Sequence, residues 1–181
     1  MADPEERLDL VAVGSAVVDR HYRLSNLPES DGGAFVGDSW RGFGGVAANV
    51  AATALRLGRN VGVLTRLGTD RHGAEADAIL ADLRDRGIHT SRLRRGDEPG
   101  AYSIVFVGPD RERMVVAGGE SVRSLTLQAA DWPYLRRARA VVTNYPVTTP
   151  AGLVLSQFLA EYTRIKQYSH ECTHICNGTG M

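Results

Sequence analysis

Two groups of residues in this 181-residue chain have the types and spacing that a chemical site needs. The first is a glycine cluster in WRGFGGVAANVAATALRLG, residues 40–58, where Gly44 and Gly45 run directly into an alanine-rich helical pattern. Glycines let a backbone come close to a ligand, and the first turn of a helix offers unpaired N–H groups. Glycines equally suit tight packing between two elements. The cluster therefore predicts either a ligand site or a close backbone contact.

The second group is the segment HECTH, residues 170–174, near the C-terminus. On a helix its two histidines share one face and suit zinc ligation, with Glu171 positioned to activate a water molecule. Cys172 and Cys176 are alternative thiolate ligands. No His, Asp or Glu follows His174 to complete the usual site. We therefore expect no catalytic zinc centre, and zinc binding through this tail is kept as a remote alternative.

Short apolar runs alternate with helical patterns over most of the chain. Nearly continuous apolar runs, typical of buried parallel strands, occupy residues 8–14, 60–68 and 139–146. Helical patterns occupy residues 46–57, 70–87, 124–138 and 149–164. Asp70 is expected to be a structural N-cap, and Gly58 is expected to end the first helix. This alternation predicts an α/β fold around a parallel sheet.

Two hairpin patterns interrupt this alternation, at about residues 20–40 and 100–118. The first contains a Pro/Gly turn region, and the second turns at GPDR, residues 108–111. We expect the two hairpins to form a small separate sheet that projects from the main one.

Three segments in this order resemble the N-terminal, substrate-side portion of the ribokinase/PfkB carbohydrate kinases: VAVGSAVVD (11–19), GFGGVAANVAATALRLG (42–58) and VGVLTRLGTDRHG (61–73). The resemblance covers residues 8 to about 150, and its most specific element is Gly-Gly-x-x-x-Asn-x-Ala at 44–51. It implies a three-layer α/β/α, ribokinase-like (Rossmann-like) sheet with a small projecting β lid, truncated on its C-terminal side. Residues 1–161 would form this portion, and residues 162–181 an atypical tail outside the fold.

The resemblance also implies a set of substrate-binding residues. In the family, the aspartate that ends the first strand binds substrate hydroxyls, and here that residue is Asp19. The glycine pair, Gly44 and Gly45, would lie against the substrate, and the amide of Asn49 would exchange hydrogen bonds with a hydroxyl. The lid residues Tyr102 and Ile104 would line the apolar face of the sugar. A surface position for Asp19 and a bracing role for Asn49 are the structural alternatives.

The implied activity is ATP- and Mg²⁺-dependent phosphorylation of a sugar or nucleoside hydroxyl, with a possible homodimer formed through the lid. The family's catalytic Gly-Ala-Gly-Asp segment has no match between residues 120 and 181. We therefore assign no catalytic residue and expect the chain to be inactive alone. A non-catalytic sugar-binding module or pseudoenzyme is the alternative.

Composition excludes several other classes of function. The formal net charge is zero, which gives no basic surface for nucleic acid. No apolar run approaches the length of a membrane span, and the acidic start is the reverse of a signal peptide. The two cysteines give no disulfide framework, so we expect a cytoplasmic protein. The last twenty residues hold both cysteines and the only lysine, which sets this tail apart from the body.

Overall fold

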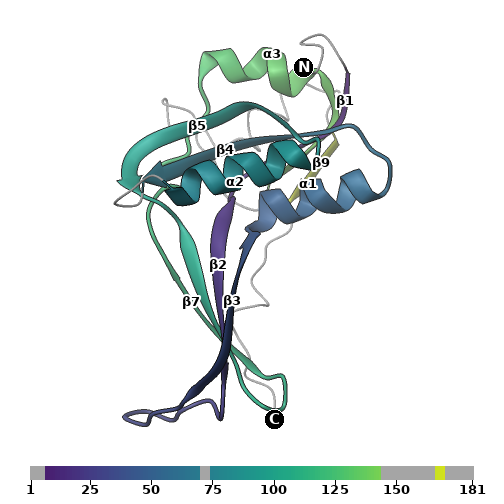
Figure 1. Cartoon of the computed structure of the whole chain (residues 1–181). Helices are drawn as coiled ribbons and strands as arrows, with labels where there is room; N and C mark the ends of the chain where they lie inside the picture. The colour runs from purple at the N-terminus through teal and green to yellow at the C-terminus, as the bar shows by residue number, and fades with distance from the viewer. Residues whose placement is uncertain (1–6, 70–73, 144–165, 170–181) are drawn as a thin grey trace.

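The structure is a computed structural model that describes residues 7–69, 74–143 and 166–169. Its strands form two sheets, a larger one from which a smaller one projects downward in Figure 1. The larger sheet has the order β5-β4-β1-β8-β9, and each neighbouring pair is parallel. Its strands are β1 (Leu8–Val13), β4 (Val61–Thr69), β5 (His89–Pro99), β8 (Ala138–Thr143) and β9 (Lys166–Ser169).

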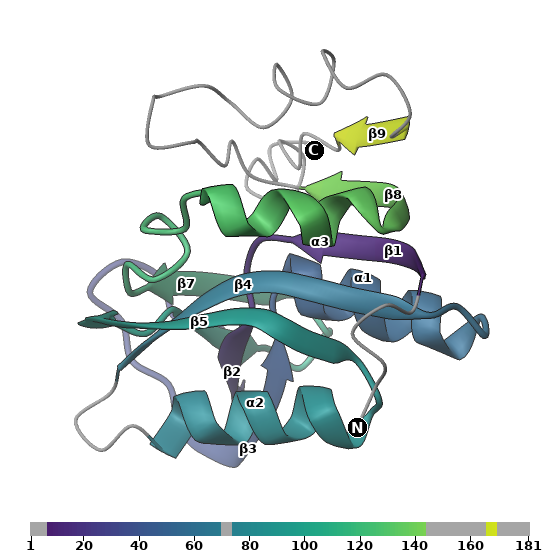
Figure 2. The ribbon, with the colours of Figure 1, turned by 90° about the horizontal axis from the view of Figure 1, so that it is seen from above.

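Helices cover both faces of this larger sheet, as the view from above shows (Figure 2). One face carries α1 (Val46–Arg56) and α2 (Ala74–Asp85). The other carries the 3-10 turn η1 (Ala129–Asp131) and the short helix α3 (Trp132–Arg136). The expected α/β/α layers are therefore confirmed.

The side chains of β1 show why both faces are covered. Val11 and Val13 point into one apolar cluster, which also contains Tyr134 of α3. Ala12 points the opposite way, into a second cluster that contains Ala51 of α1. A strand that buries side chains on both faces needs a layer on each side, and this explains its nearly continuous apolar sequence.

The smaller sheet, called the lid below, has the order β3-β2-β6-β7. Its strands are β2 (Val17–Leu24), β3 (Val36–Gly44), β6 (Tyr102–Val107) and β7 (Arg113–Gly118). The pairs β2–β3 and β6–β7 are the two antiparallel hairpins that the sequence predicts, and β2 joins β6 in parallel. The projecting β lid is therefore confirmed.

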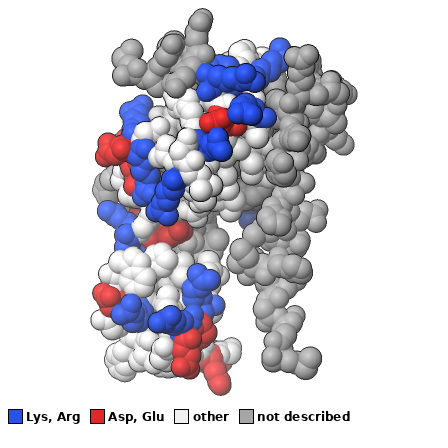
Figure 3. Space-filling view, turned by 90° about the vertical axis from the view of Figure 1, so that its right-hand side faces the viewer, with Lys and Arg blue, Asp and Glu red and all other residues white. Residues whose placement is uncertain are grey.

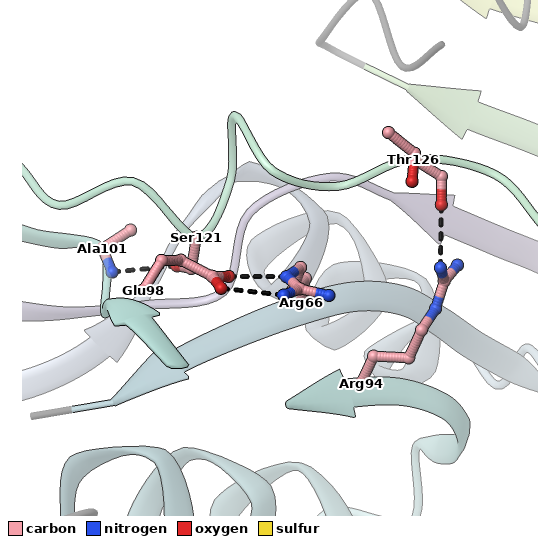
Figure 4. Close-up of polar contacts among 6 residues, drawn as sticks. All are labelled: Arg66, Arg94, Glu98, Ala101, Ser121 and Thr126. Carbon is pink, nitrogen blue, oxygen red and sulfur yellow. Dashed lines mark hydrogen bonds and ion pairs between the residues drawn. The ribbon is translucent and has the colours of Figure 1, made fainter. Parts of the chain in front are cut away.

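Two strands were not predicted. The edge strand β5 has a polar sequence, HTSRLRRGDEP, and most of its side chains are half-buried or exposed. Its Arg94 donates to the Thr126 carbonyl at 2.8 Å (Figure 4). Arg94 also donates to Asp131 Oδ2 at 2.5 Å, and the two contacts tie the strand to the segment before α3. The strand β9 lies in the stretch that the sequence places outside the fold, so the boundary at residue 161 stays a prediction.

The end of α1 agrees with the sequence, but the helix expected at 124–138 was too long, because only η1 and α3 are helical there and residues 124–128 form a turn and irregular structure. The helix α1 is followed by Gly58, whose φ of 71° is a left-handed conformation that favours glycine. Asp70 and the predicted helix at 149–164 lie outside the described residues. In the described part of the chain, no helix is both long and apolar enough to cross a membrane.

Candidate substrate-binding site

The candidate site lies where the lid joins the larger sheet. The chain passes between the two sheets after β1, before α1, before β6 and after β7. A cavity of about 390 Å³ lies at this junction, a size that suits a small ligand. Its polar side chains come from Ser15, Asp19, Asn49, Ser103 and Arg123.

The glycine pair makes room for the segment that carries the carboxylate. A β-carbon on Gly44 would collide with Oδ2 of Asp19. A β-carbon on Gly45 would lie 2.6 Å from the carbonyl oxygen of Ser15, and Gly45 has a φ of 92°. The glycine cluster therefore forms a close backbone contact, as one of its two interpretations predicts. This contact also places the start of α1 beside the cavity, which agrees with the other interpretation, a ligand site.

The start of α1 does not offer the unpaired N–H groups that the sequence suggests. The Val46 N–H donates to Ser15 Oγ at 2.9 Å. The N–H groups of Ala47 and Ala48 donate to the Ser15 carbonyl at 3.1 and 3.3 Å. Ser15 therefore caps the helix from the loop after β1, and the expectation of free helix N–H groups at this point was wrong.

Asp19 lies in the lid and not at the end of the first strand. The strand β1 ends at Val13, and Asp19 is the third residue of β2. The chain leaves the larger sheet through Gly14–Ala16, which moves the carboxylate to the root of the lid. There Oδ1 accepts a hydrogen bond from Ser103 Oγ at 2.5 Å, across the β2–β6 pair. This bond fixes the half-buried carboxylate beside the cavity.

The other sequence-predicted site residues differ in their positions. Gly45, Asn49 and Tyr102 line the same cavity as Asp19, and Asn49 is exposed on α1. Gly44 lies behind the Asp19 carboxylate. Ile104 is not among the lining residues and pairs with Arg20 in the lid register. The binding roles of all six residues stay predictions.

Sequence reasoning missed three polar residues of this cavity. Ser15 lies inside the quoted VAVGSAVVD motif but gave no sign that it would cap a helix 31 residues later. Ser103 faces Asp19 only because β2 and β6 pair in parallel, which depends on the tertiary fold. Arg123 lies in a turn after β7 and carries no motif.

Partly buried polar contacts hold the strand ends next to the lid (Figure 4). Arg66 of β4 donates to both oxygens of Glu98 on β5, at 2.5 and 2.8 Å, and this pairing lowers the pKa of Glu98. Ser121, which is 1% exposed, accepts the Ala101 N–H at 2.9 Å. The Pro99 carbonyl accepts the Ser121 N–H at 3.2 Å. The beginning and the end of the β6–β7 hairpin are thereby tied together.

A second cavity, of about 260 Å³, lies beside Arg20 of β2 and Glu75 of α2. Arg20 pairs with Glu75 at 2.5 Å, and this hydrogen bond raises the pKa of Arg20. The Arg20 guanidinium also lies 5.2 Å from the centre of the Tyr102 ring. Because both charges are already paired, this cavity is a weaker candidate for a charged or hydroxylated ligand.

In the described ranges, no group of three or more His, Cys, Asp or Glu side chains lies close enough together to hold a metal ion. The HECTH segment lies outside those ranges. On the face shown in Figure 3, basic and acidic side chains occur together over both the sheet and the lid.

Comparison with known proteins identifies the family. The model of the pfkB family carbohydrate kinases matches residues 7–164. A 5-dehydro-2-deoxygluconokinase of Shouchella clausii is 27% identical over 144 residues, which are 77% of this chain and 42% of that protein. A relative of the same name from Lacticaseibacillus casei is 27% identical over 154 residues, 83% of this chain and 44% of that protein. The chain thus spans less than half the length of these curated relatives.

Solved structures agree with this result. The structure of Arabidopsis thaliana ribokinase complexed with ribose and ATP has a TM-score of 0.64 and 26% identity. The matched region is 76% of this chain and 45% of the Arabidopsis chain. The fold is therefore ribokinase-like. Since the family model matches well over half of its residues, the chain belongs to the pfkB family of carbohydrate kinases.

Proposed function

We propose that this chain provides the substrate-binding half of an ATP- and Mg²⁺-dependent kinase that phosphorylates a hydroxyl of a sugar or nucleoside. The position of Asp19 carries the proposal. Its carboxylate borders the cavity at the root of the lid, where Ser103 orients Oδ1 and Gly44 leaves room for Oδ2. An ionised carboxylate accepts hydrogen bonds from two neighbouring hydroxyls, which is the chemistry that a polyhydroxylated substrate offers.

The other lining residues support this assignment. The amide of Asn49 both donates to and accepts from hydroxyls, so it complements the acceptor-only carboxylate. The ring of Tyr102 offers an apolar surface to the sugar. These groups bind and orient the acceptor alcohol, and phosphoryl transfer depends on such positioning together with electrostatic stabilisation. When bound, ATP supplies the phosphoryl group and Mg²⁺ balances its charge.

The substrate class has two sources of support. The Arabidopsis structure holds ribose, a neutral sugar. The curated relatives are named for a sugar acid, 5-dehydro-2-deoxygluconate. Both kinds of molecule present vicinal hydroxyls that suit Asp19, so both belong in the panel of candidate ligands. We place the protein in the cytoplasm, where ATP is available.

Residues 120–181 contain no Gly-Ala-Gly-Asp segment. We therefore also propose that the 181-residue chain binds its sugar without turning over ATP, as a sugar-binding module would. Calorimetric titration with ribose, fructose, adenosine and 5-dehydro-2-deoxygluconate, combined with an assay of ADP formation, tests both statements. Binding that is lost in Asp19→Ala, without ADP formation, is the expected result. Sugar-dependent ADP formation by the native chain would contradict the proposed absence of ATP turnover. Sugar binding that is unaffected by Asp19→Ala would contradict the proposed role of Asp19.

We propose in addition that two copies associate through the lid. Six of the eight exposed large apolar side chains in the described residues lie in the lid or next to it: Phe35, Val36, Trp40, Met114, Val115 and Val116. The Phe35 side chain is 87% exposed, so Phe35→Ser removes apolar surface at little cost to folding. Light scattering after size exclusion should show a dimer that this variant weakens. A native chain that is monomeric at every concentration would refute the association.

A further inference from the structure

The cavity carries two opposite charges. Among the described residues that line it, Asp19 is the only acidic residue and Arg123 the only basic one. A neutral sugar needs hydroxyl partners, which Asp19 and Asn49 already provide. A guanidinium in the same cavity is suited to a different partner, because its planar donors match a carboxylate or phosphate.

The start of α1 does not provide this positive charge. Its first N–H groups, which often hold anions in other proteins, donate to Ser15 instead. An anionic group of a ligand in this cavity therefore has one strong partner among the described lining residues, the guanidinium of Arg123. An anion close to Asp19 would be repelled by its carboxylate, so the anionic end must lie away from Asp19.

The backbone that carries Arg123 is held in place on both sides. Ser121 before it is 1% exposed, and Leu125 after it is 3% exposed and belongs to the core cluster below α3. The Ser124 N–H donates to the Glu120 carbonyl at 3.1 Å, and the Leu125 N–H donates to the Val122 carbonyl at 3.3 Å. This compact turn fixes the root of the exposed Arg123 side chain at the edge of the cavity.

We propose that Arg123 is a specificity residue that selects a sugar acid, by binding the substrate carboxylate while Asp19 binds hydroxyls at the other end. This inference rests on the proposed function and narrows its substrate class from sugars in general to polyhydroxylated carboxylates. It also gives the cavity a consistent charge arrangement, because Arg123 offsets the repulsion that Asp19 exerts on an anionic ligand.

The test compares one ligand with and without its charge. The native chain is titrated calorimetrically with 5-dehydro-2-deoxygluconate and with its neutral amide, at low ionic strength. We expect the acid to bind more tightly than the amide by on the order of tenfold, as a charge-assisted hydrogen bond allows. In Arg123→Gln this preference should disappear, because affinity for the acid falls much more than affinity for the amide. Arg123→Lys should keep part of the preference, because the charge is retained without the planar fork.

Arg59→Gln is the matched control, since it removes the same charge from an exposed residue that does not line the cavity. It should keep the full preference for the acid. Equal binding of acid and amide by the native chain would overturn the role of Arg123. If acid and amide bound equally and Asp19→Asn weakened the binding of both, the proposed sugar site would still stand. Absence of binding by both ligands would overturn the proposed function together with this inference. Tighter, Arg123-dependent binding of glucitol 6-phosphate would assign the residue to a phosphate and refute the carboxylate.

Discussion

Replacing Gly45 by alanine should strongly destabilise the chain, because two separate costs meet at this residue. Its φ of 92° and ψ of 149° lie in a region that is almost exclusive to glycine. An added β-carbon would also lie 2.6 Å from the Ser15 carbonyl oxygen and 3.0 Å from the α-carbon of Ala16. These are backbone atoms, so no side-chain rotation relieves the clash.

The magnitude follows from these contacts. The conformational cost is about 1–3 kcal/mol for such a backbone region. Displacing the Ser15 carbonyl also weakens its hydrogen bonds from Ala47 and Ala48, each worth about 0.5–1.5 kcal/mol. Gly45→Ala should therefore lower the free energy of unfolding by about 2–6 kcal/mol, a large part of the total for a domain of this size.

Two other glycines separate the contributions. Gly58 has a φ of 71° but nothing within 4 Å of an added β-carbon, so Gly58→Ala should cost only the conformational part, about 1–2 kcal/mol. Gly42 has neither feature, so Gly42→Ala should change stability by less than about 0.5 kcal/mol. Urea unfolding, followed by tryptophan fluorescence, measures all three. A Gly45→Ala variant no less stable than Gly58→Ala would refute the close approach of α1 to Ser15.

Three further predictions concern the contacts around the site. Arg66 lowers the pKa of Glu98, so the ionised pair stabilises the fold above the ordinary carboxylate pKa of about 4.3 and this stabilisation is lost as the pH falls. In urea titrations, Glu98→Gln should thus be less stable than the native chain at pH 7, with a difference that shrinks below about pH 4; a constant difference would contradict the pairing. Ser121→Ala leaves the Ala101 N–H without its partner, and it should cost about 1–3 kcal/mol in the same assay, whereas no cost would mean that the hydroxyl does not tie the hairpin. Gly44→Ala pushes the Asp19 carboxylate away, so calorimetry should show at least tenfold weaker sugar binding with a smaller loss of stability than Gly45→Ala, and unchanged affinity would separate Asp19 from the site.

The sequence predicted the elements whose apolar pattern is local. The strands β1, β4 and β8 and the helices α1 and α2 follow from apolar runs and helical spacing, and both hairpins follow from alternation around turns. The strand β5 was missed because its residues are polar and it depends on tertiary partners such as the Arg94–Asp131 and Arg66–Glu98 pairs. Its edge position removes the need for apolar side chains on both faces.

The candidate site was predictable only in part, and for the same reason. Family motifs pointed to Asp19, Gly45 and Asn49 as site residues, and all three line one cavity in the structure. No pattern in the sequence indicates that Ser15 occupies the start of α1, because this contact joins a loop to a helix across the lid junction. Arg123 likewise enters the cavity through the fold of a turn, which periodicity does not predict. Residues that act through long-range backbone geometry thus escape sequence reasoning.

The central claim is that substrate hydroxyls bind at Asp19, at the root of the lid. A crystal structure of the full chain with 5-dehydro-2-deoxygluconate tests it most directly. The account predicts a ligand in the cavity of about 390 Å³, with hydroxyl oxygens within hydrogen-bond distance of the Asp19 carboxylate and the Asn49 amide. A ligand bound instead in the smaller cavity beside Arg20 and Glu75, with Asp19 untouched, would contradict it.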